Sequence, residues 1–312
     1  MIQYFQIQDH RTVAVQSPDP GTWVNVLPPL RQEEFSELSK GLQIPIDFLK
    51  DSLDIDERSR YEQDDDVKLI VIKTPTENNS FNDSDAFYIT IPICIIITGT
   101  HLVTVNSFEN EAIKKFLNTF QNRRADKPNM MVLKIFEKII TNFQEYLKEI
   151  NQRRNTLEQK LYAANRNEEL FQLMRIQKSL VYFVTALRSN ELLMMKMART
   201  EFLRLTEDEK DFLDDLIIET SQALETANTY TTILVSTMDA FASIISNNQN
   251  EVLRRLSMLT IFLSVPILIA SIYGMNVPLP YQKSPYAFWI PVVISSLILI
   301  ITIYNFYKRT KR

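Results

Sequence analysis

The 20 residues from Leu256 to Met275, LSMLTIFLSVPILIASIYGM, contain no charged side chain and decide how the chain is built. At 1.5 Å of rise per residue, a helix of this length is ~30 Å long, which matches the hydrocarbon thickness of a bilayer. A second apolar run, YAFWIPVVISSLILIITIYNFY, extends from Tyr286 to Tyr307. Two adjacent runs of this length favour two membrane-spanning helices over two buried core helices. Pro266 and Pro291 lie inside the runs, where membrane helices tolerate proline.

The charges that flank the two runs predict their orientation. Arg254 and Arg255 precede the first run, and the tail after the second run holds four more bases, Lys308, Arg309, Lys311 and Arg312. Between Leu256 and Tyr307 the single charged residue is Lys283. Basic residues accumulate on the cytoplasmic side of a membrane. We therefore expect a multi-pass protein of the plasma membrane, with both termini in the cytoplasm and the loop 276–285 outside.

The composition excludes several classes of function. The 312 residues include four isolated glycines, Gly21, Gly41, Gly99 and Gly274. Phosphate-binding loops and dinucleotide fingerprints need closely spaced glycines, so neither is expected. The net charge of −4 argues against a nucleic-acid partner. No nucleophile–base arrangement is recognisable and neither His10 nor His101 belongs to a motif, so we expect neither an enzyme nor an organic cofactor.

The single cysteine, Cys94, lies in the apolar stretch IPICIII, which is typical of a small buried core residue. One cysteine cannot form an intramolecular disulfide, in agreement with a cytoplasmic domain. The N-terminal sequence MIQYFQIQDH has no basic segment followed by an apolar core, so we expect no cleavable signal peptide.

The first 128 residues predict a mixed α/β domain. Runs rich in Ile, Val, Thr and aromatic residues predict strands at 2–7, 11–16, 22–26, 67–74, 86–97 and 101–105. Helices are expected at 30–40, 45–53 and 109–122. The acidic stretch 54–66 is expected to be a solvated face, although its carboxylates are also the oxygen ligands that Mg²⁺ prefers. Residues 75–85 are expected to form a loop.

The region from 130 to 272 has no glycine and no proline before Pro266, so long helices are expected at 130–163, 168–201 and 207–273. Thr206 followed by Glu209 predicts a capping box at the start of the third helix. A helix that long needs partners along its length, which the two preceding helices and neighbouring subunits can supply.

We therefore expect an α+β fold that comprises an N-terminal cytoplasmic α/β domain, a long helical stalk and two C-terminal transmembrane helices. The expected divisions are 1–128 for the α/β domain, 129–205 for antiparallel helices, 206–255 for the stalk helix, 256–275 for the first span, 276–285 for the outer loop, 286–307 for the second span and 308–312 for the basic tail.

One face of the long helix carries a polar stripe that leads into the first span. Its members are separated by 7, 4, 7, 7 and 7 residues, close to whole turns of a helix, and they are Asp239, Ser246, Asn250, Ser257, Ser264 and Ser271. Leu253 and Leu256 fall near the same face, where a ring of leucines can form an apolar constriction. Serines in membrane helices also serve close helix packing, which is the alternative to a pore lining. Two spans cannot enclose a water-filled path, so transport would require several copies around an axis.

The stripe ends at Tyr273, Gly274, Met275 and Asn276, a YGMN sequence directly after the first apolar run. This motif, the two C-terminal spans and the basic tail KRTKR resemble the CorA family of divalent-cation transporters, which carry chiefly Mg²⁺. The sequence NEVL from Asn250 to Leu253 lies at the same spacing from the motif as in that family. The resemblance covers the whole chain.

The resemblance implies a funnel-shaped homopentamer whose pore is formed by five first spans, with the glycine-methionine-asparagine motif at the selectivity entrance. Oxygens around Gly274 and Asn276, beside Tyr273 and Met275, would bind incoming hydrated Mg²⁺. Neutral carbonyls that bind the water shell avoid the cost of dehydrating Mg²⁺. Gly274 would let the backbone turn tightly and approach the axis. Asn250 and Asp239 match the family's polar and acidic pore rings, and a ring of Asp239 carboxylates would concentrate cations.

The resemblance also implies an inhibitory Mg²⁺ site between subunits. By its spacing from the YGMN motif, Asp215 or the adjacent Asp214 matches the acid on the stalk helix. The candidates for the partner acid on the N-terminal domain of the neighbouring subunit are Glu77, Asp83 and Asp85. Mg²⁺ bound there would screen repulsion between facing carboxylates and close the ring, and its loss would open the pore.

The sequence departs from the family pattern at two places. Many members follow the motif with an acidic Met-Pro-Glu-Leu loop, whereas this loop is VPLPYQKSPY, with Lys283 and no acid. Ile267 stands on the expected pore face where better-known members carry threonine. Both departures concern which ion is carried.

We interpret the chain as a channel-like Mg²⁺ transporter that is driven by the electrochemical gradient and regulated by intracellular Mg²⁺. Transport of Co²⁺, Ni²⁺ or Zn²⁺ is one alternative, although a dedicated site for a soft metal would need His or Cys near the pore. A membrane-anchored coiled-coil scaffold without conduction is the other alternative, and it requires neither the polar stripe nor the YGMN sequence. The expected partners are further copies of the chain, the lipid bilayer and divalent cations.

Overall fold

The computed structural model describes residues 2–310 except 9–10, 18, 28–31, 53, 79–85, 107–109, 121–127, 165–166, 276–282 and 284. The chain divides into two compact units, Met1–Met238 and Asp239–Arg312. The first unit contains a sheet with helices packed on it, and the second contains the end of one long helix and a further helix.

Seven strands form one mixed sheet in the first unit, in the order β2-β1-β3-β7-β6-β5-β4. Their bounds are β1 Ile2–Gln8, β2 Arg11–Val15, β3 Trp23–Val26, β4 Arg60–Asp64, β5 Val67–Glu77, β6 Tyr88–Ile97 and β7 Leu102–Asn106. Strands β3 and β7 pair in parallel, and the other neighbouring strands pair antiparallel. The predicted mixed α/β character of this region is therefore confirmed.

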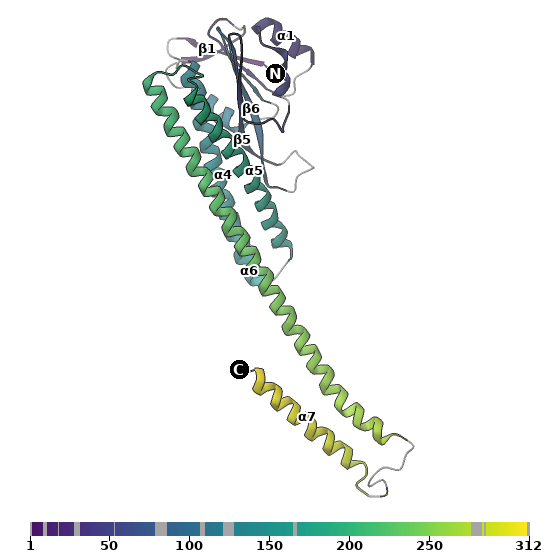
Figure 1. Ribbon diagram of the computed structural model, residues 1–312. Helices are drawn as coiled ribbons and strands as arrows, with labels where there is room; N and C mark the ends of the chain where they lie inside the picture. Colours follow the sequence, from purple (N-terminus) through teal and green to yellow (C-terminus); the bar gives the residue numbers. More distant parts are fainter. Residues whose placement is uncertain are drawn as a thin grey trace. The chain divides into compact units, whose positions relative to one another are not determined.

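Short helices cover one face of the sheet and long helices cover the other (Figure 1). Helices α1 (Gln32–Leu42) and α2 (Ile46–Asp51) pack on alternate residues of the central strands, such as Val71, Cys94 and Val103. Helices α4 (Pro128–Ala164) and α5 (Asn167–Arg199) pack on the opposite face, against β5 and β6. With both faces covered, β6 is buried along nine of its ten residues, which explains its almost continuous apolar sequence.

A chain of buried hydrogen bonds joins β1, β3 and β7 beneath α3 (Glu111–Phe120). The Trp23 indole Nε1 donates to Thr104 Oγ1 at 3.0 Å, Thr104 Oγ1 donates to Asn25 Oδ1 at 2.9 Å, and Asn25 Nδ2 donates to Gln3 Oε1 at 3.2 Å. The Trp23 ring also meets Phe116 of α3 edge-on, with centroids 5.2 Å apart. Each polar group in this row has a partner, which offsets the cost of burying it.

The three predicted long helices are confirmed, with α6 extending without interruption from Glu207 to Tyr273. Pro266 lies inside α6 and does not end it. The last helix, α7 (Trp289–Thr310), begins three residues after the predicted start of the second apolar run. Tyr286 precedes the helix, and its carbonyl accepts the backbone N–H groups of Trp289 at 2.9 Å and Ile290 at 3.2 Å.

Strand β4, with the sequence RYEQD, lies inside the acidic stretch that was expected only to be a solvated face. Its last three residues are exposed, so the expectation of solvated acids is confirmed, but the backbone pairs with β5 from Arg60↔Val71 to Asp64↔Val67. Asp65, with φ 48°, makes the tight turn of this hairpin. Acidic residues rarely favour a strand, and this edge strand is stable because the apolar β5 supplies its partner.

The side chain of Asn190 on α5 completes the edge of β5 beyond the end of β4. Its Nδ2 donates to the carbonyl of Lys73 at 2.7 Å, and its Oδ1 accepts the N–H of Lys73 at 3.0 Å. Oδ1 also accepts a hydrogen bond from Ser59 Oγ at 2.7 Å. Asn190 is 2% exposed, so it fixes α5 to the sheet through a buried contact that imitates a neighbouring strand.

We predict that Asn190→Ala destabilises the full chain by about 2 kcal/mol, because the backbone N–H and C=O of Lys73 lose their partner. The apparent Tm in detergent should fall by several degrees. The matched control is Thr185→Ala on the same helix, whose exposed hydroxyl bonds only to the carbonyl of Val181 at 2.8 Å. An equal fall in Tm for both variants would contradict this role for Asn190.

Cys94 is fully buried in β6, as the sequence predicts, and burial raises the pKa of its thiol. Because the thiolate is the reactive form, we predict that Cys94 does not react with a water-soluble disulfide reagent in the folded chain at pH 8. One equivalent should react after denaturation, measured by absorbance of the released thiolate. Stoichiometric labelling of the folded chain would contradict this placement.

Candidate ion pathway

The predicted capping box lies at the start of α6. The backbone N–H of Thr206 donates to Glu209 Oε2 at 2.8 Å, and the Thr206 hydroxyl donates to the same oxygen at 3.0 Å. Glu207, Asp208 and Glu209 place three acids in the first turn, where the helix dipole favours negative charge. The Glu209 half of the predicted capping box is therefore confirmed, whereas the Thr206 hydroxyl donates to the Glu209 carboxylate and does not accept the backbone N–H of Glu209.

The turn that precedes α6 is held by the β4–β5 hairpin. The Tyr61 ring lies 4.5 Å from the ring of Phe202, centroid to centroid, and the Lys68 ammonium lies 5.0 Å from the same ring. Lys68 Nζ also donates to the carbonyl of Phe202. Glu201 and Arg204, on either side, have positive φ values of 49° and 52°, a conformation that costs energy in residues other than glycine. The hairpin contacts offset this cost and fix the turn.

The distal part of α6 carries the residues of the predicted stripe. Each of them is exposed in the single chain: Asp239, Ser246, Asn250, Ser257, Ser264 and Ser271. Leu253 and Leu256 are also exposed, at 60% and 54%. Within the described residues, this face of α6 is therefore uncovered and available to water or to another helix.

Two hydroxyls at the stripe, those of Ser264 and the nearby Thr260, bond back to their own helix. Ser264 Oγ donates to the carbonyl of Thr260 at 2.7 Å, and Thr260 Oγ1 donates to the carbonyl of Leu256 at 3.0 Å. The hydroxyl proton is thus used within the helix, and the oxygen lone pairs remain available as acceptors. Such a surface can accept hydrogen bonds from the water shell of a cation.

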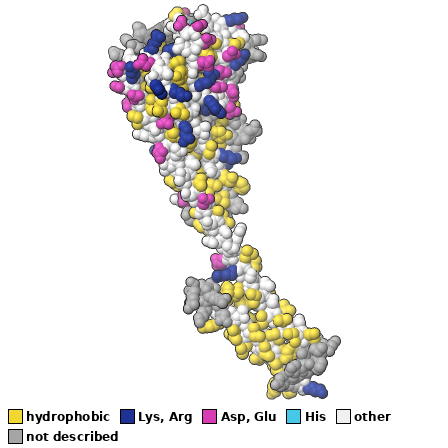
Figure 2. Space-filling view, in the orientation of Figure 1, with side chains coloured by type: hydrophobic (Ala, Val, Ile, Leu, Met, Phe, Trp, Pro, Cys, Tyr) yellow, Lys and Arg dark blue, Asp and Glu magenta, His cyan; other side chains and the backbone are white. Residues whose placement is uncertain are grey.

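Among the described residues, α6 is the one helix that is long and apolar enough to cross a membrane, and none of its 18-residue apolar window is buried within the chain. The apolar part of α7 is shorter, from Trp289 to Tyr304. Figure 2 shows hydrophobic side chains gathered over the second unit, whereas charged side chains are spread over the first unit.

Gly274 lies one residue beyond the end of α6 and keeps a helical hydrogen bond, from its N–H to the carbonyl of Ala270 at 2.9 Å. Its φ is not positive, so the tight turn expected there is not made by a left-handed glycine. An added Cβ would lie 3.4 Å from the Ala270 oxygen, an ordinary contact. The chain itself therefore accepts alanine at this position. Met275 is exposed, and Asn276 lies outside the described residues.

The predicted regulatory acids are on separate elements of the first unit. Asp214 and Asp215 are exposed on α6, and Glu77 is exposed at the end of β5. Asp83 and Asp85 lie outside the described residues. Asp214 also lines a cavity of about 140 Å³ at the α5–α6 turn, together with Glu201 and Lys210. Within the described part of one chain, no three or more His, Cys, Asp or Glu residues form a group that could hold a metal.

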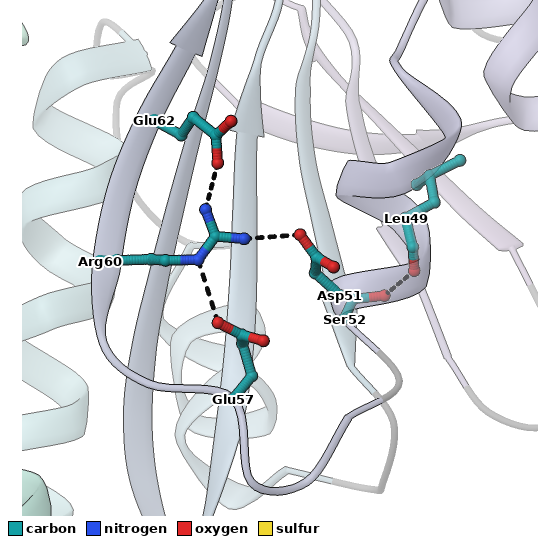
Figure 3. Close-up of polar contacts among 6 residues, drawn as sticks. All are labelled: Leu49, Asp51, Ser52, Glu57, Arg60 and Glu62. Carbon is teal, nitrogen blue, oxygen red and sulfur yellow. Dashed lines mark hydrogen bonds and ion pairs between the residues drawn. The ribbon is translucent and has the colours of Figure 1, made fainter.

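The acids of the β4 region surround an arginine rather than a metal site (Figure 3). Arg60 Nη2 is 2.5 Å from Asp51 Oδ2, Arg60 Nε is 3.0 Å from Glu57 Oε1, and Arg60 Nη1 pairs with Glu62. Burial raises the pKa of Asp51, and the charge of Arg60 opposes that rise. The guanidinium thus neutralises carboxylates that the sequence offered as Mg²⁺ ligands. Neither β4 nor this cluster was predicted.

Comparison with known proteins decides the family. A family model described as CorA-like Mg²⁺ transporter protein matches residues 20–309. The chain belongs to the CorA family. Membership confirms the resemblance drawn from the YGMN sequence and the C-terminal apolar runs.

Two curated CorA proteins are similar along nearly the whole chain. The cobalt/magnesium transport protein CorA of Methanocaldococcus jannaschii is 28% identical over 292 residues, which cover 92% of this chain and 90% of that protein. The protein of the same name from Thermotoga maritima is 20% identical over 315 residues, which cover 97% of this chain and 89% of that protein.

A solved structure extends the similarity to the fold. The complete structure of the CorA magnesium transporter from Methanocaldococcus jannaschii matches with a TM-score of 0.86 and 26% identity. The match covers 98% of this chain and 97% of that chain. The combination of a mixed sheet domain with long helices is therefore the CorA fold.

Proposed function

We propose that this CorA-family chain is a channel-like transporter that admits Mg²⁺ into the cytoplasm down its electrochemical gradient. The observation that carries the proposal is the exposed polar stripe of α6, which continues into an apolar segment and ends at the YGMN sequence. The family and the two cobalt/magnesium transport relatives support the choice of cation.

The proposed assembly is a homopentamer in a plasma membrane, with α6 lining the axis and α7 completing two spans per subunit. The apolar runs 256–275 and 286–307 are the spans, both termini are cytoplasmic, and the loop 276–285 is outside. A divalent ion gains ~4.6 kcal/mol per 100 mV of inward-negative potential, so uptake needs no nucleotide hydrolysis.

The proposed path has three parts. Tyr273, Gly274, Met275 and Asn276 bind the hydrated ion at the outer entrance through neutral oxygens. The serines and Asn250 accept hydrogen bonds from its water shell, and Leu253 and Leu256 form a constriction that closes by excluding water. Asp239 supplies a ring of carboxylates at the cytoplasmic end, which concentrates cations.

A second candidate is Co²⁺ transport, which the names of both relatives favour. The sequence has no histidine or cysteine after His101, so neither α6 nor α7 offers the soft ligands that a dedicated Zn²⁺ or Ni²⁺ site uses. A scaffold without conduction could use the serines for close helix packing, but it gives no role to Asp239 and Asn250 on the same face or to the YGMN sequence.

We predict that Gly274→Ala and Asn276→Ala each lower Mg²⁺ uptake into proteoliposomes at least tenfold, measured with a Mg²⁺-sensitive dye and an imposed potential. A methyl group on each of five subunits would narrow the entrance, and loss of the Asn276 amide would remove ligands for the water shell. Because alanine fits at position 274 within one chain, the loss would report on the pathway and not on folding.

The matched control is Gly99→Ala, since a Cβ on this exposed glycine meets nothing within 4 Å. It should transport like the wild type. Wild-type rates in both the Gly274 and Asn276 variants would refute the entrance, and equal Co²⁺ and Mg²⁺ rates in the wild type would favour the second candidate.

Gating is proposed to depend on Mg²⁺ held between Asp215, or Asp214, and an acid of the neighbouring subunit among Glu77, Asp83 and Asp85. Asp215→Lys should therefore keep transport active at millimolar internal Mg²⁺, where the wild type is inhibited, because an ammonium group cannot bind the ion. Dose–response curves for internal Mg²⁺ provide the measurement.

The matched control is Asp47→Lys, which makes the same charge change at an exposed site on α2 and should leave the inhibition curve unchanged. An unchanged inhibition curve for Asp215→Lys would exclude Asp215 from the regulatory site.

A further inference from the structure

Helix α5 carries an apolar face that no described part of its own chain covers. The exposed members recur at helical spacing and form what we term the α5 stripe: Phe171, Met174, Val181, Tyr182, Leu192 and Met195. Their exposed fractions range from 41% for Tyr182 to 65% for Phe171. A face of this length on a long helix indicates a contact with another protein surface.

The charges beside the α5 stripe are basic, and those on the first half of α6 are acidic. Exposed bases on α5 include Arg188, Lys196 and Arg199. Apart from Lys210, which pairs with Glu201 and Glu207, the charged residues that α6 exposes from 207 to 238 are acidic: Glu207, Asp208, Asp211, Asp214, Asp215, Glu219 and Glu225. Two exposed isoleucines, Ile218 at 55% and Ile233 at 41%, interrupt this acidic surface. The two surfaces are therefore complementary in both charge and apolar content.

Most of these charges have no ion-pair partner in the part of the chain that the structure describes, and the exception is Glu207, which pairs with Lys210 at 3.1 Å. Among the described residues, the ion pairs include none with Arg188, Lys196, Asp211 or Glu219. The acidic surface of α6 and the α5 stripe are both exposed in the same chain, so they do not cover one another. A contact between them needs a second copy.

The antiparallel run of α5 and α6 gives the register of such a contact (Figure 1). Helix α5 ends at Arg199 and α6 begins at Glu207, on the two sides of the turn. Both helices rise by the same distance per residue away from the turn, so a residue of α5 and a residue of α6 lie at the same height when their numbers sum to about 406. Contacts of α4 support the same alignment of heights. Asn129 Nδ2 donates to the carbonyl of Leu203 near the turn, and farther along the helices Arg154 lies over the Tyr230 ring at 6.0 Å.

This register places complementary residues opposite one another. Met174 has the height of Ile233, and both are apolar and exposed. Arg188 has the height of Glu219, and Lys196 has the height of Asp211. Subunits related by rotation about an axis parallel to the helices keep these heights, so each pair can meet across a boundary between neighbours.

We propose that α5 of one copy packs against the acidic surface of α6 of the next copy, with Met174 on Ile233, Arg188 on Glu219 and Lys196 on Asp211. The contact joins two different surfaces, so its repeated use generates a ring when the rotation between copies closes. The inference rests on the proposed function for the assumption that several copies surround an axis.

The direction of the α6 surface supports a lateral contact. On an ideal helix, with about 100° per residue, Asp211, Ile218 and Ile233 lie roughly a quarter-turn from the face of Asp239. If the Asp239 face points toward the axis, the face of Ile218 and Ile233 points sideways toward a neighbour. The pathway and the subunit contact thus use different sides of one helix.

Cross-linking in membranes tests the contact without measuring transport. Full-length Met174→Cys/Ile233→Cys, treated with a short bismaleimide, should give a ladder of covalent oligomers above the dimer, and each single variant should stay monomeric. Cys94 is buried and is kept in place. The matched control is Leu192→Cys/Ile233→Cys, which has the same exposure pattern but a height mismatch of about 28 Å, and it should give no ladder.

Three outcomes would overturn the contact. They are no ladder from Met174→Cys/Ile233→Cys, an equal ladder from the control pair, or a dimer from Met174→Cys alone, which would indicate an α5–α5 contact. A ladder in a chain that carries no Mg²⁺ would leave the contact standing and refute the proposed function. Mg²⁺ uptake without a ladder would refute the contact alone.

A charge exchange tests the polar pair. Arg188→Glu and Glu219→Arg should each lower the oligomeric fraction several-fold in detergent, measured by native mass spectrometry, and the double variant should restore it. Arg188→Lys should keep the oligomer because it keeps the charge. Failure of the double variant to restore the oligomer would exclude this pairing.

Discussion

A polar face on a helix that enters hydrocarbon must find partners, and the rest of this chain depends on how α6 meets that constraint. The backbone groups are satisfied inside the helix, and hydroxyls such as that of Ser264 bond to the preceding turn. Asn250 and Asp239 precede the apolar segment, where water can solvate them, but the remaining lone pairs of Ser257, Ser264 and Ser271 lie within that segment. An unsatisfied polar group in a membrane costs several kcal/mol, so the stripe requires water or another protein surface beside it.

The first unit can be understood as the support for that helix. The hairpin of β4 and β5 holds the turn around Phe202, and Asn190 fixes α5 to the edge of β5. The hydrogen bond from the Thr206 N–H to Glu209 then caps the start of α6. Together these contacts fix the first turn of α6 to the sheet domain.

Much of this organisation can be predicted from the sequence, for specific reasons. The absence of glycine and early proline between 130 and 272 predicts three long helices, and runs rich in Ile, Val, Thr and aromatic residues predict six of the seven strands. Strand β4 was not predicted because RYEQD is acidic, and its pairing comes from β5 rather than from its own residues. The Arg60 cluster was also missed, because it joins α2, a loop and a strand that only the fold brings together. The contact of Asn190 with the backbone of Lys73 could not be predicted, because a side chain that takes the place of a neighbouring strand leaves no pattern in the sequence.

The hydroxyls that bond back to α6 have a consequence for protons. Between Leu256 and Ile272 the helix contains no carboxylate, amine, imidazole or thiol, and the oxygens left facing outward belong to groups that do not ionise near neutral pH. The stretch therefore keeps one electrostatic character across the physiological range, and no proton can be exchanged for a passing cation along it. If ions follow this face, acidity can act on them only at the carboxylates that lie before the apolar segment.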